Sequence, residues 1–159
     1  EGYFQAVTVA HGRRLRAAKE HELILQADVF INVPVLKSHG GATLTVAMKN
    51  LMGVVWDRGE WHANNLHQCI ADFARYRKPD LNVVDAYNVL MRHGPRGVSA
   101  ADVANLRAQL LTTDLVTADA AAAKLFGLEP DAVDYIRIAS EMGVGRKDLD
   151  KLNIQRIAL

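Results

Sequence analysis

The sequence predicts an α/β domain, a layered structure in which helices flank a mostly parallel β-sheet. Short runs of β-branched and aliphatic residues alternate along the chain with longer amphipathic stretches, the order expected when helices connect parallel strands. Half of the 159 residues are hydrophobic and 23% are charged, which is ordinary for a globular domain of this size. We therefore expect residues 1–159 to form a single domain, either a whole one or the C-terminal portion of a longer one.

The individual elements follow from periodicity and from the residues that end each run. A short apolar run at 28–33, closed by Pro34, predicts a strand buried on both faces. Residues 64–76 carry apolar side chains on one stripe, which predicts the clearest amphipathic helix. The other elements expected are a strand at 3–9, a helical stretch at 20–27, a loop at 38–41, a helix at 42–52 closed by Gly53, strands at 81–84 and 109–112, a loop at 91–98, helices at 115–126 and 131–142, a loop at 143–145 and an edge strand at 152–157.

Residues 37–50, with the sequence KSHGGATLTVAMKN, form the best candidate for a binding site. Gly40 and Gly41 can adopt positive φ and let the backbone approach a ligand closely. They also precede a predicted helix, whose N-terminus would attract an anion. Lys37 and Lys49 would add positive charge. Further contacts to the ligand are expected from Ser38, Thr45 and Asn50.

The alternative interpretation of this stretch is a plain tight turn with solvent-exposed lysines. The spacing of a phosphate-binding P-loop is absent, and so is that of a dinucleotide-binding fingerprint. An anion-binding loop of another kind is therefore the hypothesis, and the ligand or cofactor itself is not identified.

Three aspartates are candidates for positioning or charge-balancing these groups. Asp85 and Asp114 follow predicted strands, and the carboxyl ends of parallel strands share one edge of a sheet. Asp119 lies on a helix face that should pack against the sheet, where a carboxylate is costly to bury without a partner. The alternatives are a turn for Asp85, a helix N-cap for Asp114 and a structural pair for Asp119. Convergence of the three on a divalent metal is a further hypothesis, but we assign no residue as a metal ligand.

His39 is the candidate catalytic residue. Among the proposed site residues, only histidine has an ordinary pKa that suits proton transfer near neutrality, so His39 is the candidate general acid or base. Cys69 lies on the apolar stripe of the 64–76 helix, and we expect it to be buried and unreactive.

Composition argues against several classes of partner. Nineteen basic and eighteen acidic residues give a formal net charge of +1, which favours neither nucleic acid nor an anionic membrane surface. One cysteine cannot hold an iron–sulfur cluster, which needs about four ligands, so any such cluster would sit on another chain. No apolar run approaches the ~20 residues of a membrane span. A cytoplasmic location is the default expectation, or an exported one if an N-terminal signal has been removed.

Several motifs together resemble the domain-of-unknown-function 362 family of bacteria and archaea. They are DVFINVPVLKSHG at 28–40, TVAMKNLMG at 45–53, DLNVVDA at 80–86, the Gly94-Pro95 loop, DLVTADA at 114–120 and the closing residues 139–145. Some members of that family carry ferredoxin-like iron–sulfur modules, and others carry twin-arginine export signals. If this chain takes part in redox chemistry, the resemblance implies that it borrows the electron carrier, for which a ferredoxin-like protein is the candidate partner.

The sequence is consistent with two functions. The first is the binding of a small anionic molecule or cofactor at strand carboxyl ends, by a protein that could be an enzyme of redox-linked metabolism. The second is a non-catalytic module that docks an electron-transfer or maturation protein. The second would present an exposed apolar patch rather than a crevice, with residues 56–61 and their two tryptophans as the place to look.

Overall fold

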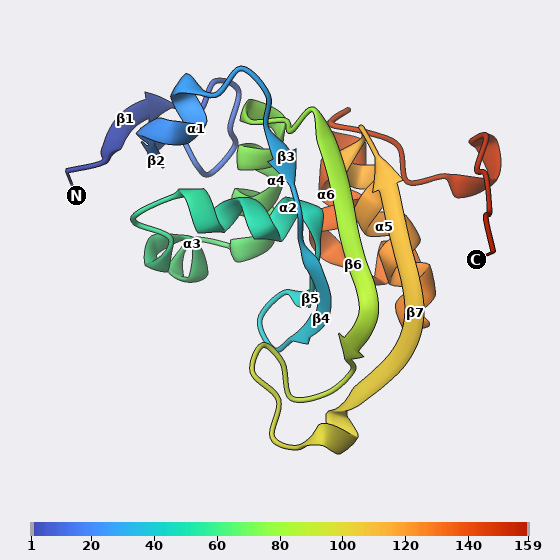
Figure 1. Cartoon of the computed structure of the whole chain (residues 1–159). Helices are drawn as coiled ribbons and strands as arrows, with labels where there is room; N and C mark the ends of the chain where they lie inside the picture. The colour runs from blue at the N-terminus through green and yellow to red at the C-terminus, as the bar shows by residue number, and fades with distance from the viewer. Residues whose placement is uncertain (1, 159) are drawn as a thin grey trace.

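A five-stranded sheet forms the centre of the structure, a computed structural model that describes residues 2–158 (Figure 1). Its central strand is β6 (Leu81–Leu90), with which β3 (Ile31–Asn32) and β4 (Val35–His39) both pair in parallel. β5 (Thr43–Thr45) pairs antiparallel with β4, and β7 (Val103–Thr112) pairs antiparallel with β6. The predicted α/β class is confirmed, with parallel pairing inside the sheet and antiparallel strands at its edges.

Strands β3 and β4 are two halves of one interrupted strand. Pro34 lies between them and has no N–H to donate, but its carbonyl oxygen accepts the backbone N–H of Asp85 at 2.8 Å. The chain therefore stays extended beyond Pro34, where the sequence predicted the strand to end. The second half carries Lys37 and His39 into the sheet.

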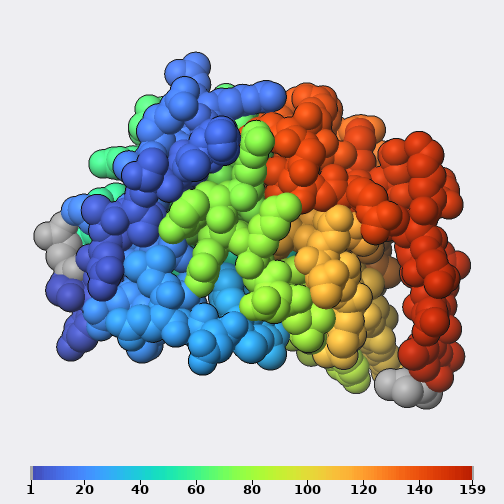
Figure 2. Space-filling view, turned by 90° about the horizontal axis from the view of Figure 1, so that it is seen from above, coloured from blue at the N-terminus to red at the C-terminus, as the bar shows by residue number. Residues whose placement is uncertain are grey.

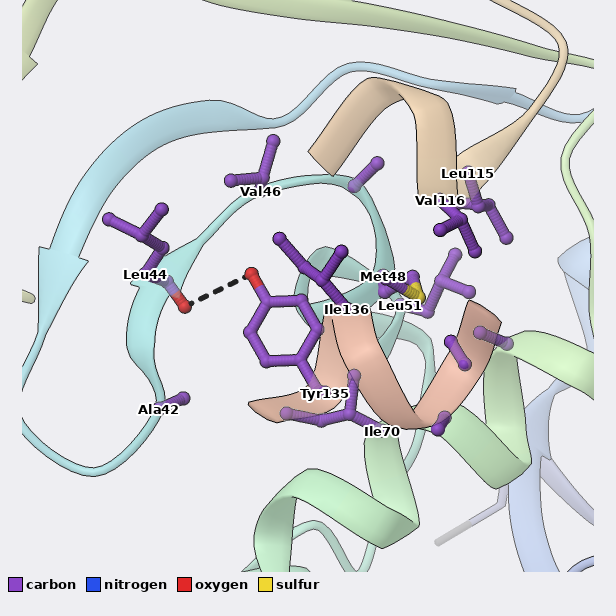
Figure 3. Packing of buried hydrophobic residues seen from close by; sticks show 14 of the residues in the cluster. Ala42, Leu44, Val46, Met48, Leu51, Ile70, Leu115, Val116, Tyr135 and Ile136 are labelled. Atoms are coloured by element: carbon purple, nitrogen blue, oxygen red, sulfur yellow. Dashed lines mark hydrogen bonds between the residues drawn. The ribbon is translucent and has the colours of Figure 1, made fainter. Parts of the chain in front are cut away.

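Helices pack on one side of the sheet, behind it in Figure 1. They are α2 (Ala47–Asn50), α4 (Leu66–Tyr76), α5 (Leu115–Phe126) and α6 (Asp134–Glu141). Figure 3 shows the ring of Tyr135, on α6, among the buried side chains of Leu44 and Ile136. Fully burying an aliphatic or aromatic side chain contributes about 1.5–3 kcal/mol, so this layer holds the sheet and helices together.

The opposite side of the sheet leaves large apolar side chains exposed. Ile31, Val33, Val35, Tyr87 and Leu111 are all between 44% and 62% exposed, and we call this set the outer sheet face. The prediction that the strand at 28–33 is buried on both faces is therefore wrong. Ile31 and Val33 are exposed on this face, and the buried position between them is the polar residue Asn32, at 3% exposed.

The N-terminal region forms a separate two-stranded sheet of β1 (Phe4–Thr8) and β2 (Ala17–His21), followed by α1 (Glu22–Gln26). The buried carboxylate of Asp72, on α4, accepts the backbone N–H groups of Arg14 and Leu15 and so ties the hairpin loop to the core. Figure 2 shows this region, in blue, at the opposite end of the molecule from the red C-terminal segment.

The remaining elements are short. They are η1 (Leu51–Val54), α3 (Gly59–Ala63), η2 (Ala100–Asp102), η3 (Pro130–Ala132) and η4 (Leu149–Lys151). Within residues 2–158, no helix has the length and apolar character needed to cross a lipid bilayer.

Two further sequence predictions of secondary structure are wrong. The predicted helix at 42–52 is split, because Thr43–Thr45 pairs with β4 as a strand before the helical residues begin. Residues 152–157, predicted as an edge strand, form no regular element. Both errors concern short segments, in which the local pattern does not show whether the chain pairs with a distant strand. Helix α5, in contrast, begins and ends at the predicted residues.

Candidate anion-binding site

A hollow of about 300 Å³ lies beside β4 and collects residues from several segments of the chain. Its lining residues are Lys37 and His39 of β4, Thr45 of β5, Lys49 and Asn50 of α2, Met52 and Gly53 of η1, Arg58, His62 of α3, and Pro95. Five of the residues that the sequence analysis singled out, at positions 37, 39, 45, 49 and 50, therefore meet in one place.

The β4–β5 hairpin explains why these side chains meet. Lys37 lies opposite Thr45 in the ladder, and His39 lies opposite Thr43. Paired residues on neighbouring strands project to the same side of a sheet, so Lys37, His39 and Thr45 share one face. Helix α2 begins two residues after Thr45 and adds Lys49 to the same hollow.

The hollow is rich in positive charge and has no acidic residue in its lining. Within residues 2–158, Lys37, Lys49 and Arg58 make no ion pair, and the contact recorded for the Lys49 ammonium is the Met52 sulfur at 3.7 Å. The pKa of Lys49 is lowered, first by burial and then by the like charges of Lys37 and Arg58. A bound anion would relieve this repulsion.

His39 is held as a neutral imidazole. Its Nδ1 accepts the backbone N–H groups of Gly41 and Ala42, each at 3.1 Å. Its pKa is lowered to about 4, first by burial and then by the charges of Lys49, His62 and Lys37. Because Nδ1 is an acceptor, the ring proton belongs on Nε2. At neutral pH this geometry favours a hydrogen-bond donor over the general acid or base that the sequence predicted.

Thr45 supplies a polar atom without a partner. The residue is 8% exposed, and its hydroxyl oxygen is buried with no hydrogen-bond partner among the described residues. Leaving a buried hydroxyl unsatisfied costs about 1–3 kcal/mol. Because Thr45 also lines the hollow, its hydroxyl is a candidate donor to a ligand bound there.

Asn50 is oriented by a row of buried amides. Its Nδ2 donates to Oδ1 of Asn32 at 2.8 Å, and Asn32 in turn donates to Oδ1 of Asn82 at 2.9 Å and to the carbonyl of Ala47. This row links β3, β6 and α2. The wall of the hollow that Asn50 forms is therefore attached to the centre of the sheet.

Ser38, Gly40 and Gly41 are not among the residues that line the hollow. The Ser38 hydroxyl accepts the backbone N–H of Gly94 at 3.0 Å, which holds the loop that carries Pro95. The two glycines form the turn between β4 and β5, and neither has the positive φ that the sequence analysis expected. Positive φ occurs instead at Thr43, where φ is 65°.

The helix N-terminus expected to attract an external anion is occupied by the protein's own Asp119. The carboxylate oxygens of this buried side chain accept the backbone N–H of Ala47 at 2.7 Å and of Met48 at 3.2 Å. Burial raises the pKa of Asp119 to about 8, although hydrogen bonds from Met48, Ala47 and Tyr135 act in the opposite direction. Asp119 therefore fixes the start of α2 and does not line the hollow.

Asp85 and Asp114 also lie outside the hollow. Strand β6 continues past Asp85, whose Oδ1 accepts the backbone N–H of Tyr87 at 2.9 Å. Asp114 caps α5 by accepting the N–H of Thr117, and its other oxygen accepts the N–H of Arg146. Because β7 runs antiparallel to β6, its end lies at the opposite edge of the sheet. In residues 2–158, no three His, Cys, Asp or Glu side chains are placed to share a metal ion.

A larger hollow, of about 750 Å³, lies between the C-terminal segment and the end of α5. We do not regard it as the better site, because charges of both signs line it and pair with each other. Lys124 pairs with Glu129, and Lys147 pairs with Asp131.

Arg58 and His62 are the basic residues of the anion-binding hollow that the sequence did not predict. Both lie in or next to the segment with the two tryptophans. Trp61 is a core residue at 2% exposed, whereas Trp56 is 47% exposed and lies 5.2 Å from the ring of Phe4. The core position of Trp61 places Arg58 and His62 beside α2, a relation that sequence spacing does not reveal. Cys69 is buried, and its thiol pKa is raised to about 11 by burial and by Asp72.

Comparison with known proteins decides the family. The family described as "Domain of unknown function (DUF362)" matches residues 1–124. The chain belongs to this family. The resemblance in the motifs at 28–53 and 80–120 is thereby confirmed.

The thylakoid-associated protein sll1697 of Synechocystis sp. is a curated protein that is similar to this chain. It is 28% identical over 138 residues, which are 82% of this chain and 41% of the relative. The chain thus spans about two fifths of the length of that relative. No solved structure matches the chain.

Proposed function

We propose that this protein binds a small anionic molecule in the hollow beside β4. The observation that carries the proposal is the meeting of Lys37, Lys49 and Arg58, without a carboxylate, around a buried hydroxyl that lacks a partner. Unpaired cations held together in a partly buried space repel each other, and this repulsion is reduced when an anion binds. The volume of about 300 Å³ lies at the lower end of the range for ligand sites.

The binding energy is expected to come from hydrogen bonds to a charged ligand. Each bond of this kind contributes about 1.5–3 kcal/mol. Lys49→Ala should therefore weaken anion binding by roughly 10- to 100-fold, and Lys37→Ala should do the same. Neither lysine forms an ion pair in the free protein, so both variants should keep their stability within about 1 kcal/mol of the wild type.

The test is isothermal titration of the purified chain with inorganic phosphate, sulfate, succinate and acetate at low ionic strength. Lys151→Ala is the matched control, because Lys151 is 80% exposed and is far in sequence from the residues of the hollow. We expect at least one anion to bind the wild type and the control equally, and to bind both hollow variants more weakly. If no anion binds, or if Lys37→Ala and Lys49→Ala bind as well as the control, the proposal is wrong.

That the bound anion takes part in a chemical reaction on this protein stays a prediction. The general acid–base role of His39 and the place of the protein in redox-linked metabolism rest on the sequence alone. A hydrogen-bond donor at Nε2 of His39 is the role that we propose for this residue, because it requires no change in the two backbone hydrogen bonds at Nδ1.

A second candidate function has one observation in its favour, the outer sheet face. Strands in parallel pairs are usually covered on both sides, yet Ile31 of β3 and Val35 of β4 are 52% and 44% exposed. We propose that an apolar surface of a partner polypeptide covers this face. That the partner is a ferredoxin-like electron carrier stays a prediction.

Photo-crosslinking tests the second candidate directly. A photoreactive amino acid at position 33 should crosslink the chain to a distinct polypeptide in cells, and the same group at exposed position 151 should not. Crosslinks to a second copy of this chain, or no crosslink at position 33, would count against a partner on the outer sheet face.

A further inference from the structure

At least five polar side chains of the hollow can donate a hydrogen bond to a ligand. Lys37, Lys49 and Arg58 have only donors. His39 presents its Nε2–H, because Nδ1 is already an acceptor for two backbone amides. The hydroxyl of Thr45 can donate as well, and it has no acceptor among the described residues. A ligand that satisfies these groups needs several acceptor oxygens.

These donors belong to four separate segments of the chain. Lys37 and His39 come from β4, Thr45 from β5, Lys49 from α2, and Arg58 from the residue before α3. A single planar carboxylate is matched best by one guanidinium fork, whose two parallel N–H groups meet its two oxygens. Donors on separate segments suit a tetrahedral group, which presents oxygens in several directions.

The charge of the hollow favours a ligand with more than one negative charge. Its three basic side chains, Lys37, Lys49 and Arg58, face no acidic side chain in the lining. One carboxylate would neutralise one of the three charges, whereas a phosphate monoester carries about −1.5 to −2 at pH 7 and has three strong acceptor oxygens. Both the number of acceptors and the charge are better matched by the ester.

The size of the hollow limits the rest of the ligand. A volume of about 300 Å³ equals the liquid volume of roughly ten water molecules, which is enough for a phosphoryl group and a small organic body. Met52, Gly53 and Pro95 supply a less polar part of the wall for that body. A polymer such as a nucleic acid would need a continuous basic groove, and the chain has a formal net charge of only +1.

We propose that the ligand is a phosphoryl compound, namely a small phosphate monoester, held by Lys37, Lys49 and Arg58 with the Thr45 hydroxyl as an additional donor. This inference rests on the proposed anion-binding function. It goes beyond that function because it names the chemical class of the ligand and assigns a role to Thr45.

The first experiment compares anions on the intact chain. Isothermal titration with glycerol 3-phosphate, inorganic phosphate, succinate and acetate separates shape from charge, because succinate carries two negative charges without a tetrahedral group. We expect the ester to bind at least tenfold more tightly than succinate and acetate. Tighter binding of the ester than of inorganic phosphate supports a monoester as the ligand, and tighter binding of inorganic phosphate overturns that part. Equal binding of succinate and the ester overturns the phosphoryl assignment while anion binding stands. If none of the four binds, the proposed function fails as well.

The second experiment uses Thr45→Val, which removes the hydroxyl and keeps the shape of the side chain. The hydroxyl has no hydrogen bond to lose in the free protein, so the unfolding midpoint of the variant should equal or exceed that of the wild type. Affinity for glycerol 3-phosphate should fall about tenfold or more, and Thr45→Ser should restore most of it. A lowered unfolding midpoint with unchanged affinity would show that Thr45 is structural, and would overturn its assignment as a ligand donor.

Discussion

Substitution of Asp119 by alanine tests the connection between the core and the hollow. The change removes both acceptors at the start of α2, which bond to the N–H groups of Ala47 at 2.7 Å and Met48 at 3.2 Å. These donors lie in residues that are fully buried, so water cannot replace the lost partners.

The magnitude follows from the two hydrogen bonds. A buried donor left without an acceptor costs about 1–3 kcal/mol, so Asp119→Ala should lower the free energy of unfolding by about 2–6 kcal/mol. A domain of this size has a total stability of about 5–15 kcal/mol, so the variant should be visibly weakened and still measurable. Asp119→Asn retains one acceptor oxygen and should lose about 1–3 kcal/mol.

Urea denaturation followed by tryptophan fluorescence measures this change, because Trp61 is buried at 2% exposed. The midpoint should fall in the order wild type, Asp119→Asn, Asp119→Ala, with similar slopes. A loss below 1 kcal/mol for Asp119→Ala would refute the reasoning, because it would mean that the two amides find other partners or that α2 is not held by this carboxylate.

The remaining predictions concern pH and the loop at Gly94. The pKa of Asp119 is raised from its ordinary value to about 8, so its contribution to stability is full below about pH 4 and is lost as the pH rises to about 8. Urea denaturation across this range should therefore show that the difference in unfolding free energy between wild type and Asp119→Asn shrinks as the pH rises. A difference that does not change with pH would contradict the assignment. The pKa of His39 is lowered to about 4, so its contribution to stability is present above its ordinary pKa of 6.5 and is lost as the pH falls towards 4. The difference in unfolding free energy between wild type and His39→Gln should therefore grow as the pH rises, the opposite of the trend for Asp119. Gly94→Ala would place a Cβ 1.8 Å from the carbonyl oxygen of Ser38, so thermal unfolding should show a free energy of unfolding that is lower by about 1–3 kcal/mol. Gly59→Ala is the control, because nothing lies within 4 Å of the new Cβ, and it should show no decrease.

The sequence predicted the helices better than the strands. Residues 115–126 form α5 as predicted, because its N-cap Asp114 and its C-cap Gly127, with φ of 89°, are local signals. The amphipathic stripe at 64–76 likewise locates α4, which starts two residues later than predicted. Strand β2 and the extensions of β6 and β7 were not predicted, because long-range pairing and not local pattern stabilises them.

The candidate site was predicted in part. Lys37, His39 and Lys49 were found because they lie in one short stretch whose two lysines flank a turn. Asp85 and Asp114 were placed at the same edge only on the assumption of parallel strands, and the antiparallel direction of β7 removes that relation. The direction of a strand depends on how the segment before it packs, and this packing cannot be read from a single sequence.

Asp119 shows how a correct observation led to an incomplete interpretation. The sequence indicated that this carboxylate is buried and needs a partner, and the structure shows it buried. Its partners are backbone amides of residues 47 and 48, which are 72 and 71 positions away. The glycine turn and Asp119 were treated as two separate features, but the aspartate occupies the helix start that the turn was expected to offer to a ligand.

The most direct measurement is a crystal structure of the protein with arsenate, a tetrahedral oxyanion whose anomalous scattering reveals its position. Our account predicts an anomalous peak in the hollow, within hydrogen-bonding distance of the Lys37 and Lys49 ammonium groups and the Thr45 hydroxyl. A peak at another place, or an empty hollow in which both lysines extend into solvent at saturating arsenate, would contradict it.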